Sequence, residues 1–230
     1  DPSTTLQPGN PSSRTIYLNR CAASGCTINS GPESAVNNTS SIQYTGSAHY
    51  EPFPYGDTAW NALVQCVREV YADFDIQIVD TRPTSGTYWM HVVGGNATDF
   101  YGANPEGQGV LGVSPGSPTC PGQLLNNTVT FTFAADSPSN TNYLCHIVAQ
   151  ETAHSFGLDH EALAGDVMTY IGLGNTSPSR YTFKNQSGAC GATQANDDGC
   201  FCPSVPQQNS YQRVMAVFGP SGPTPPAITI

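Results

Sequence analysis

The chain reads Gln150-Glu151-Thr152-Ala153-His154-Ser155-Phe156-Gly157-Leu158-Asp159-His160, and the rest of its sequence is best understood from this stretch. Residues four apart lie on one face of an α-helix, so Gln150 and His154 can point toward one place from adjacent turns. Gly157 lets the chain leave the helix, since glycine adopts the left-handed conformation with which many helices end. This turn brings His160 back toward the same place. The spacing predicts a helix, a glycine turn and three converging side chains.

Three side chains in this arrangement suit a catalytic zinc ion, which takes three protein ligands and keeps one position open. Glu151 stands next to the first ligand position, where its carboxylate can reach a water molecule at the metal and act as general base. We therefore predict a metal site made by Gln150, His154 and His160, with Glu151 as the catalytic base.

The run differs at one position from the zinc-binding signature H-E-x-x-H-x-x-G-x-x-H. The segment Asp166-Val167-Met168-Thr169-Tyr170, which follows it, resembles the Met-turn of the metzincins. The chain thus resembles the metzincin clan of zinc metallopeptidases. The resemblance implies that Glu151 is the base, that His154 and His160 bind zinc, and that Met168 lies beneath the metal.

Tyr170 stands two residues after Met168, which resembles the M-x-Y form of astacins and serralysins. In that form the tyrosine hydroxyl hydrogen-bonds the tetrahedral intermediate; the alternative is a tyrosine that only fills the core.

The resemblance also implies an α+β fold of the metzincin, or zincin-like, type. Its upper lobe, ending near residue 157, has a twisted mixed sheet and two long helices, and its lower lobe is irregular and pinned by disulfides.

Gln150 replaces the first histidine of the signature. Its amide oxygen reaches about as far as the distal nitrogen of histidine and is also neutral, so Gln150 can bind a metal without a shift of the helix. An amide oxygen is a weaker donor to zinc than imidazole and tolerates harder cations. We expect weakened zinc binding. The alternatives are a site that fills only when zinc is abundant, an empty site, or another metal.

His146 is the other candidate for the missing ligand, because it lies on the same helical stripe as Gln150 and His154. Two full turns separate His146 from His154, however, which is too far for both to bind one ion from an unbroken helix. We interpret His146 as a polar residue near the helix start, and His49 and His91 as ordinary polar residues.

Hydrophobic periodicity predicts the elements around this helix. Strands are expected at 15–18, 76–80, 87–93, 110–113 and 128–133, and helices at 58–74, 142–156 and 211–218. Ser139, Asn140 or Thr141 is expected to cap the second helix. This order resembles the upper lobe of the metzincins over most of residues 15–170.

A candidate substrate-binding edge strand comprises Gly109, Val110, Leu111, Gly112 and Val113. The resemblance implies that this strand runs antiparallel to its neighbour and pairs with an extended peptide. Such β-augmentation favours unfolded or flexible peptide segments as substrates.

Composition marks residues 1–14 as an N-terminal arm and 219–230 as a Pro-rich tail. The resemblance implies that 15–218 form a single metzincin-like catalytic domain. The resemblance places the specificity pocket in the loop at about 171–190.

The formal net charge of −10 argues against nucleic acid as a partner and disfavours anionic membranes. No apolar run approaches the roughly 18–20 residues of a membrane-spanning helix. A monomer that acts on peptide or protein substrates is expected.

Eight cysteines without repeated C-x-x-C pairs indicate an oxidising compartment, and hence secretion. We expect Cys21–Cys26 and Cys120–Cys145 disulfides, and separate disulfides for Cys200 and Cys202. Asp197-Asp198 is either a structural calcium site or a plain solvated turn.

Two functions follow from these observations. The first is a secreted zinc-dependent endopeptidase with Glu151 as general base. The second, motivated by Gln150, is a non-catalytic pseudopeptidase that binds peptide or protein through the inherited cleft.

Overall fold

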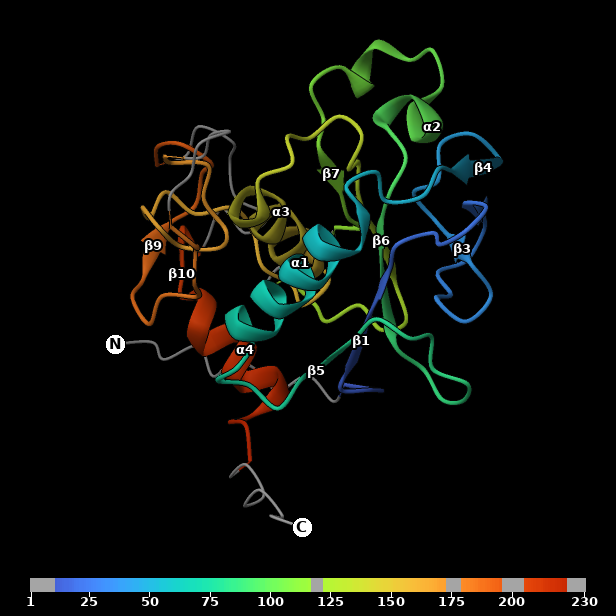
Figure 1. Cartoon of the computed structure of the whole chain (residues 1–230). Helices are drawn as coiled ribbons and strands as arrows, with labels where there is room; N and C mark the ends of the chain where they lie inside the picture. Colours follow the sequence, from blue (N-terminus) through green and yellow to red (C-terminus); the bar gives the residue numbers. More distant parts are fainter. Residues whose placement is uncertain (1–10, 117–121, 173–178, 196–204, 223–230) are drawn as a thin grey trace.

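The computed structural model describes residues 11–116, 122–172, 179–195 and 205–222. Its central element is a twisted five-stranded mixed sheet with the order β5-β1-β6-β8-β7 (Figure 1). Its strands are β1 (Thr15–Asn19), β5 (Gln77–Val79), β6 (Trp89–Val93), β7 (Gly112–Val113) and β8 (Val129–Thr132). Neighbouring strands are parallel except β7, which runs antiparallel to β8 at one edge. The sheet therefore has an antiparallel edge strand, as the resemblance implies.

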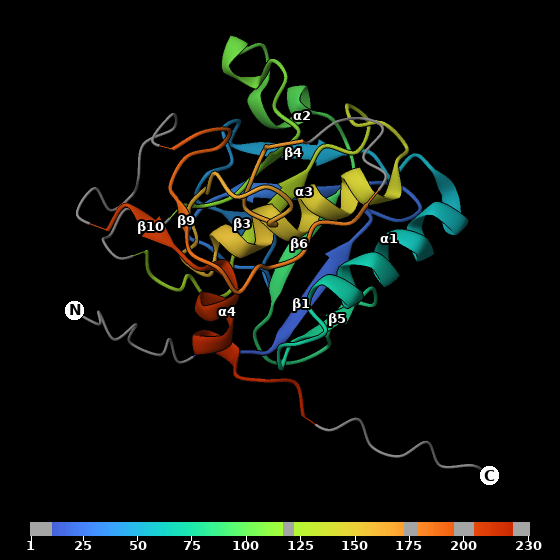
Figure 2. The same cartoon turned by 90° about the vertical axis from the view of Figure 1, so that its left-hand side faces the viewer.

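Two long helices, α1 (Gly56–Val70) and α3 (Thr141–His154), cover one face of this sheet (Figure 2). In α1, buried apolar side chains recur at intervals of three and four residues, which produces one packed stripe. Asn140 begins α3, and its side-chain oxygen accepts a hydrogen bond from the Tyr143 backbone N–H at 3.1 Å. Asn140 is thus the cap among the three expected residues.

A second layer covers the opposite face of the sheet. It contains a three-stranded sheet of β2 (Cys26–Ser30), β3 (Thr39–Ser40) and β4 (Ser47–Tyr50), together with the short helix α2 (Ala97–Tyr101). The strand β1 explains the two cores: Ile16 and Leu18 pack on the helical side, whereas Tyr17 packs on the other side. The sequence analysis did not predict this layer.

The C-terminal part contributes β9 (Gly188–Ala189), β10 (Gln207–Gln208) and α4 (Ser210–Phe218). Arg213 of α4 donates hydrogen bonds from Nε to the Phe156 carbonyl at 2.8 Å and from Nη2 to the Gly122 carbonyl at 2.6 Å. Phe156 follows the end of α3, so a cation at its carbonyl also suits the helix dipole. Helix α4 therefore fixes the turn that leaves α3.

The helices and strands predicted from periodicity are confirmed, with ends that differ by a few residues. The edge strand is shorter than predicted: only Gly112 and Val113 are extended, because Gly109 has φ +78° and turns the chain. Gly109, Val110 and Leu111 therefore belong to the loop before β7.

Two of the disulfide predictions have a definite outcome. The Cys21–Cys26 bond is confirmed. The Cys120–Cys145 pairing is wrong, because Cys145 bonds Cys66 of α1, the helix that packs beside α3. Several predictions concern segments outside the described residues: the arm over 1–10, Cys120, part of the loop at 171–190, Asp197-Asp198, Cys200, Cys202 and the tail from 223.

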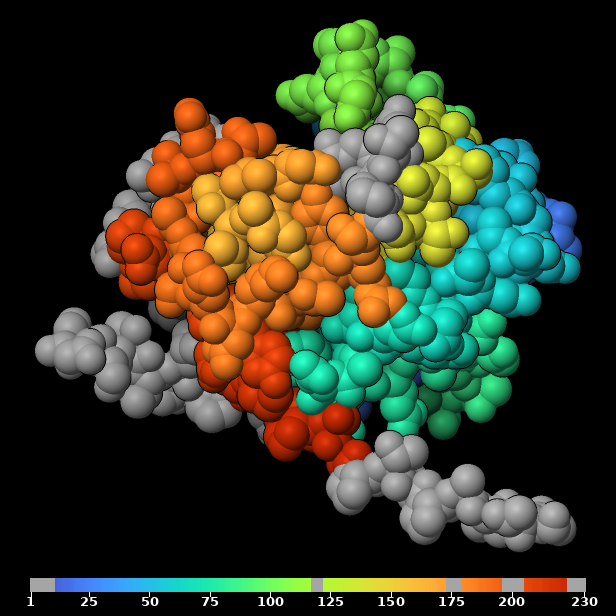
Figure 3. Space-filling view, turned by 60° about the vertical axis from the view of Figure 1, so that its left-hand side comes forward, coloured from blue at the N-terminus to red at the C-terminus, as the bar shows by residue number. Residues whose placement is uncertain are grey.

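The surface has one clear projection. The segment that carries α2 and the 3₁₀ helix η1 (Pro105–Gly107) stands out from the rest of the molecule, above the segments of the C-terminal part (Figure 3). None of the described helices is long and apolar enough to cross a membrane.

Candidate active site

The C-terminal end of α3 places Gln150, Glu151 and His154 in the protein interior, where each is less than a tenth exposed. The helix is followed by Gly157, which has φ +81°. A Cβ at this position would lie 2.4 Å from the Gly122 carbonyl oxygen, so the turn needs glycine both for its conformation and for space. The predicted glycine turn is confirmed.

The turn brings the His160 ring to the His154 ring, with 3.2 Å between the two Nε2 atoms. Nδ1 of His154 lies 2.8 Å from the Leu158 carbonyl oxygen. A carbonyl can only accept, so Nδ1 carries the proton and Nε2 presents a lone pair. Two nitrogen ligands of a tetrahedral zinc ion, each about 2.0–2.1 Å from it, are about 3.3 Å apart. The histidine pair fits such an ion.

Glu151 points toward the sheet edge rather than toward solvent. A Cβ on Gly112 of β7 would lie 2.7 Å from Glu151 Cγ and 2.8 Å from its Oε1, so the edge strand and the carboxyl group are in contact. Burial raises the pKa of the Glu151 carboxyl to about 8. A cation held by the neighbouring histidines would lower this pKa, because it stabilises the carboxylate.

Gln150 and His146 bind the same backbone oxygen. Gln150 Nε2 donates to the Val167 carbonyl at 3.2 Å, and His146 Nε2 lies 2.6 Å from it. The acceptor fixes the orientation of the amide, since only the nitrogen can donate; Oε1 is thus the atom of Gln150 left for a ligand. His146 also stacks on Tyr181, with ring centroids 4.3 Å apart. It is a buried anchor of the segment around Val167, not a polar residue at the helix start.

The segment around Met168 is held by Asp166. Its carboxylate accepts hydrogen bonds from the Met168 N–H at 2.7 Å, the Lys184 N–H at 2.7 Å and the Ser210 hydroxyl at 2.5 Å. Met168 itself is completely buried in the main core cluster. These contacts fix the predicted Met-turn segment against the C-terminal elements.

Tyr170 lies at the border of the site. Its ring centroid is 4.7 Å from that of His160, and the residue is 37% exposed. An aromatic hydroxyl on a partly exposed ring beside a candidate ligand can reach a bound molecule. A tyrosine that only fills the core would be more deeply buried.

Two polar groups near the site are buried, which the sequence does not predict: Glu161, and His91, interpreted above as an ordinary polar residue. Glu161 is completely buried, and its burial, the negative charge of Asp166 and a hydrogen bond with the Asp166 carboxyl raise its pKa to about 9. His91 lies beneath α3, with Nδ1 2.6 Å from Thr130 Oγ1 and Nε2 2.7 Å from Thr132 Oγ1. Neither residue stands in a motif, so no local signal indicated its burial.

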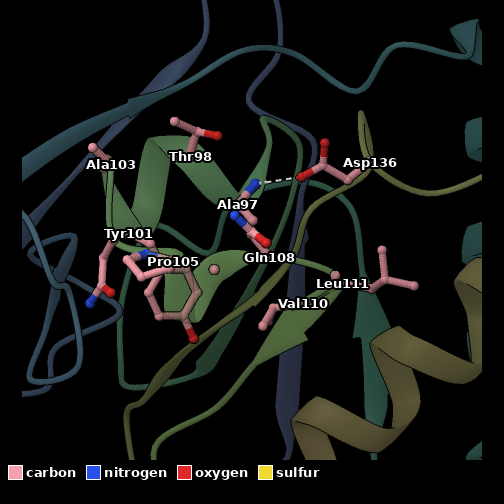
Figure 4. A pocket seen from close by; sticks show the side chains of 13 residues that line it. Ala97, Thr98, Tyr101, Ala103, Pro105, Gln108, Val110, Leu111 and Asp136 are labelled. Carbon is pink, nitrogen blue, oxygen red and sulfur yellow. Dashed lines mark hydrogen bonds between the residues drawn. The ribbon is translucent and has the colours of Figure 1, made fainter.

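A pocket of about 550 Å³ lies between the projecting segment and the start of β7 (Figure 4). Its lining comes from α2, η1 and the loop that leads to β7, with Asp136 from the loop after β8. The pocket therefore lies beside the beginning of β7, the edge strand that contacts Glu151.

The structure thus links the predicted site residues through a series of contacts, from Gly112 to Glu151 on α3, and from His154 through His160 to Tyr170. Among the described residues, no group of three or more His, Cys, Asp or Glu side chains is placed to hold a metal ion; position 150 carries Gln. Comparisons with protein-family models and with curated proteins find no match to this chain.

Proposed function

We propose that this protein is a secreted, zinc-dependent endopeptidase of the metzincin type. The observation that carries the proposal is the 3.2 Å separation between His154 Nε2 and His160 Nε2. Glu151, which lies on α3 with His154, is buried beside them. The donor set of two imidazoles with one amide fits a weakly bound zinc ion. Gln150 Oε1, His154 and His160 would hold it.

The proposed reaction is hydrolysis of a peptide bond that lies along β7. Held by Gln150, His154 and His160, a zinc ion would act as a Lewis acid toward the scissile carbonyl. A Glu151 carboxylate oxygen takes a proton from the attacking water, and the same carboxyl then gives a proton to the leaving amine nitrogen. The Tyr170 hydroxyl donates a hydrogen bond to the oxyanion.

The contact of Gly112 with Glu151 positions the substrate in this proposal. An extended peptide that adds to the outer side of β7 would pass directly in front of the glutamate. No strand in the described ranges covers that side of β7, which is the last strand of its sheet. Recognition through backbone hydrogen bonds favours unfolded substrates over folded ones.

The test is hydrolysis of an unfolded protein at rising zinc concentration, with a chelator as control. Wild-type protein is expected to cleave, and Glu151→Gln is expected to lose activity by a factor of about 10² or more, since it removes the general base. Glu69→Gln provides the matched control, because Glu69 is a surface glutamate on α1. Cleavage that persists in chelator, or in Glu151→Gln, would overturn the proposal.

A second candidate function is a pseudopeptidase that binds peptides without cutting them. The hydrogen bond from Gln150 Nε2 to Val167 favours it, because it gives Gln150 a structural role that needs no metal. This candidate predicts peptide binding that is unchanged by zinc and by chelator, with no cleavage at any zinc concentration.

A further inference from the structure

We propose that the pocket beside β7 is a subsite that receives a cationic side chain, Lys or Arg, of a bound peptide. This inference rests on the proposed peptide-binding function of β7 and adds a preference that the metal site itself does not set. Its residues come from the projecting segment and from the loop after β8.

The pocket lies close enough to β7 to receive a side chain of a peptide bound along that strand. The lining includes Gly109, Val110 and Leu111, which lead directly into Gly112, the residue against Glu151. An extended chain advances about 3.3 Å per residue. A peptide whose scissile bond lies at Gly112 therefore places the side chain two or three residues away at the pocket.

The size and shape of the pocket suit a long side chain. Its volume of about 550 Å³ is ample for one such group. Figure 4 shows the Tyr101 and Pro105 side chains together on one side and Asp136 on the other. The Tyr101 ring is held in place by Gly107, where a Cβ would lie 2.9 Å from the ring. A ring face and a carboxylate together bind the stem and the head of Lys or Arg.

The charges around the pocket have one sign. The described lining residues include the carboxylate of Asp136 and contain no Lys, Arg or His. Burial raises the pKa of Tyr101, and the negative charge of Glu106, which the Glu151→Gln protein keeps, raises it further. Asp136 Oδ2 accepts a hydrogen bond from the Ala97 N–H at 2.6 Å, which fixes the carboxylate at the pocket. A cation is the ligand that this field attracts.

The experiment measures binding rather than cleavage. Fluorescent peptides of eight residues carry Lys or uncharged norleucine at one position, and their affinity for the Glu151→Gln protein is read from fluorescence anisotropy. In one register, Lys is expected to bind about three- to tenfold more tightly than norleucine, the range of a partly exposed ion pair with a cation–π contact. Higher salt should reduce this preference.

Two variants test the pocket itself. Asp136→Asn keeps an oxygen acceptor for the Ala97 N–H but removes the charge, and Thr98→Lys places a cation on an exposed position of the lining. Both are expected to abolish the Lys preference, whereas Asp73→Asn on an exposed loop after α1 should retain it. Thermal unfolding of each variant establishes that it is folded.

The outcomes separate this inference from the proposed catalysis. Equal binding of Lys and norleucine peptides at every position, no binding of either, or a preference that survives in both folded pocket variants would overturn the subsite. Hydrolysis by wild-type protein is measured separately. Lys-dependent binding without hydrolysis would support the subsite and contradict the peptidase. Hydrolysis without Lys-dependent binding would support the peptidase and contradict the subsite.

Discussion

Gly112 and Glu151 are in direct contact across the edge of the sheet: a Cβ at position 112 would lie 2.7 Å from Glu151 Cγ. The same Cβ would lie 2.8 Å from Ile147 Cγ2. Gly112→Ala must therefore displace the Glu151 and Ile147 side chains or push α3 and β7 apart. We expect a loss of about 1–3 kcal/mol in the free energy of unfolding, as for other overpacked sites. Denaturant unfolding measures this loss.

The same substitution should also slow peptide hydrolysis under conditions in which the variant remains folded. A displacement of about 1 Å in a catalytic group can cost on the order of a hundredfold in rate. Gly31→Ala is the matched control, because a Cβ there would meet its nearest neighbour at an ordinary 3.6 Å. If Gly112→Ala cleaves as well as Gly31→Ala, Glu151 is not positioned through this contact.

Gln150→His should strengthen zinc binding. Imidazole nitrogen is a better zinc donor than an amide oxygen, so the third ligand position would gain affinity. Mutation of a residue that hydrogen-bonds a zinc ligand alters zinc affinity by about 10–100-fold. Exchange of the ligand itself should change zinc affinity by at least that much. Isothermal titration with zinc measures the effect, with Gln65→His on the exposed side of α1 as control. Equal affinities in all three proteins would exclude position 150 as a ligand.

The Cys66–Cys145 bond joins α1 to α3 and closes a sequence separation of 79 residues, whereas Cys21–Cys26 closes only 5. Loop-closure entropy predicts that the long bond contributes about 4–5 kcal/mol and the short one about 2 kcal/mol. Cys→Ala exchange of both members of each pair, followed by denaturant unfolding, compares them. A larger loss from the short pair would contradict the entropic account.

Acid should destabilise the fold through His91. Burial lowers the pKa of His91 from 6.5 to about 3. Between these values the unfolded chain binds a proton that the folded protein does not, so the stabilisation is complete above pH 6.5 and is lost as pH falls toward 3. At pH 4.5 the loss relative to pH 7 is about 2–3 kcal/mol.

His91→Gln removes this titration and keeps a group that can hydrogen-bond the threonines around it. The stability of this variant should fall less between pH 7 and pH 4.5 than that of the wild type. His49→Gln is the control, because the His49 side chain is half exposed. Parallel pH profiles of wild type and His91→Gln would refute the assignment.

Much of the site could be predicted because its signals are local. The spacing of Gln150, His154 and Gly157 depends only on helix geometry and on the one residue type that ends the helix without strain. The long elements were likewise predictable, because the apolar residues of each buried face recur in the sequence with the helical or strand period. The short strands over residues 26–50 were not, since few of their side chains are buried and their pairing joins separate segments.

The sequence by itself determined that α3 ends in a glycine turn and that two histidines follow Glu151 at fixed spacing. Only the tertiary structure decided which distant groups meet there: Cys66 with Cys145, Gly112 with Glu151, and His146 and Gln150 with the Val167 carbonyl. The reason is physical. Periodicity reports that a side chain is buried, but its partner depends on how separate elements pack, and that information lies in no single stretch of the chain.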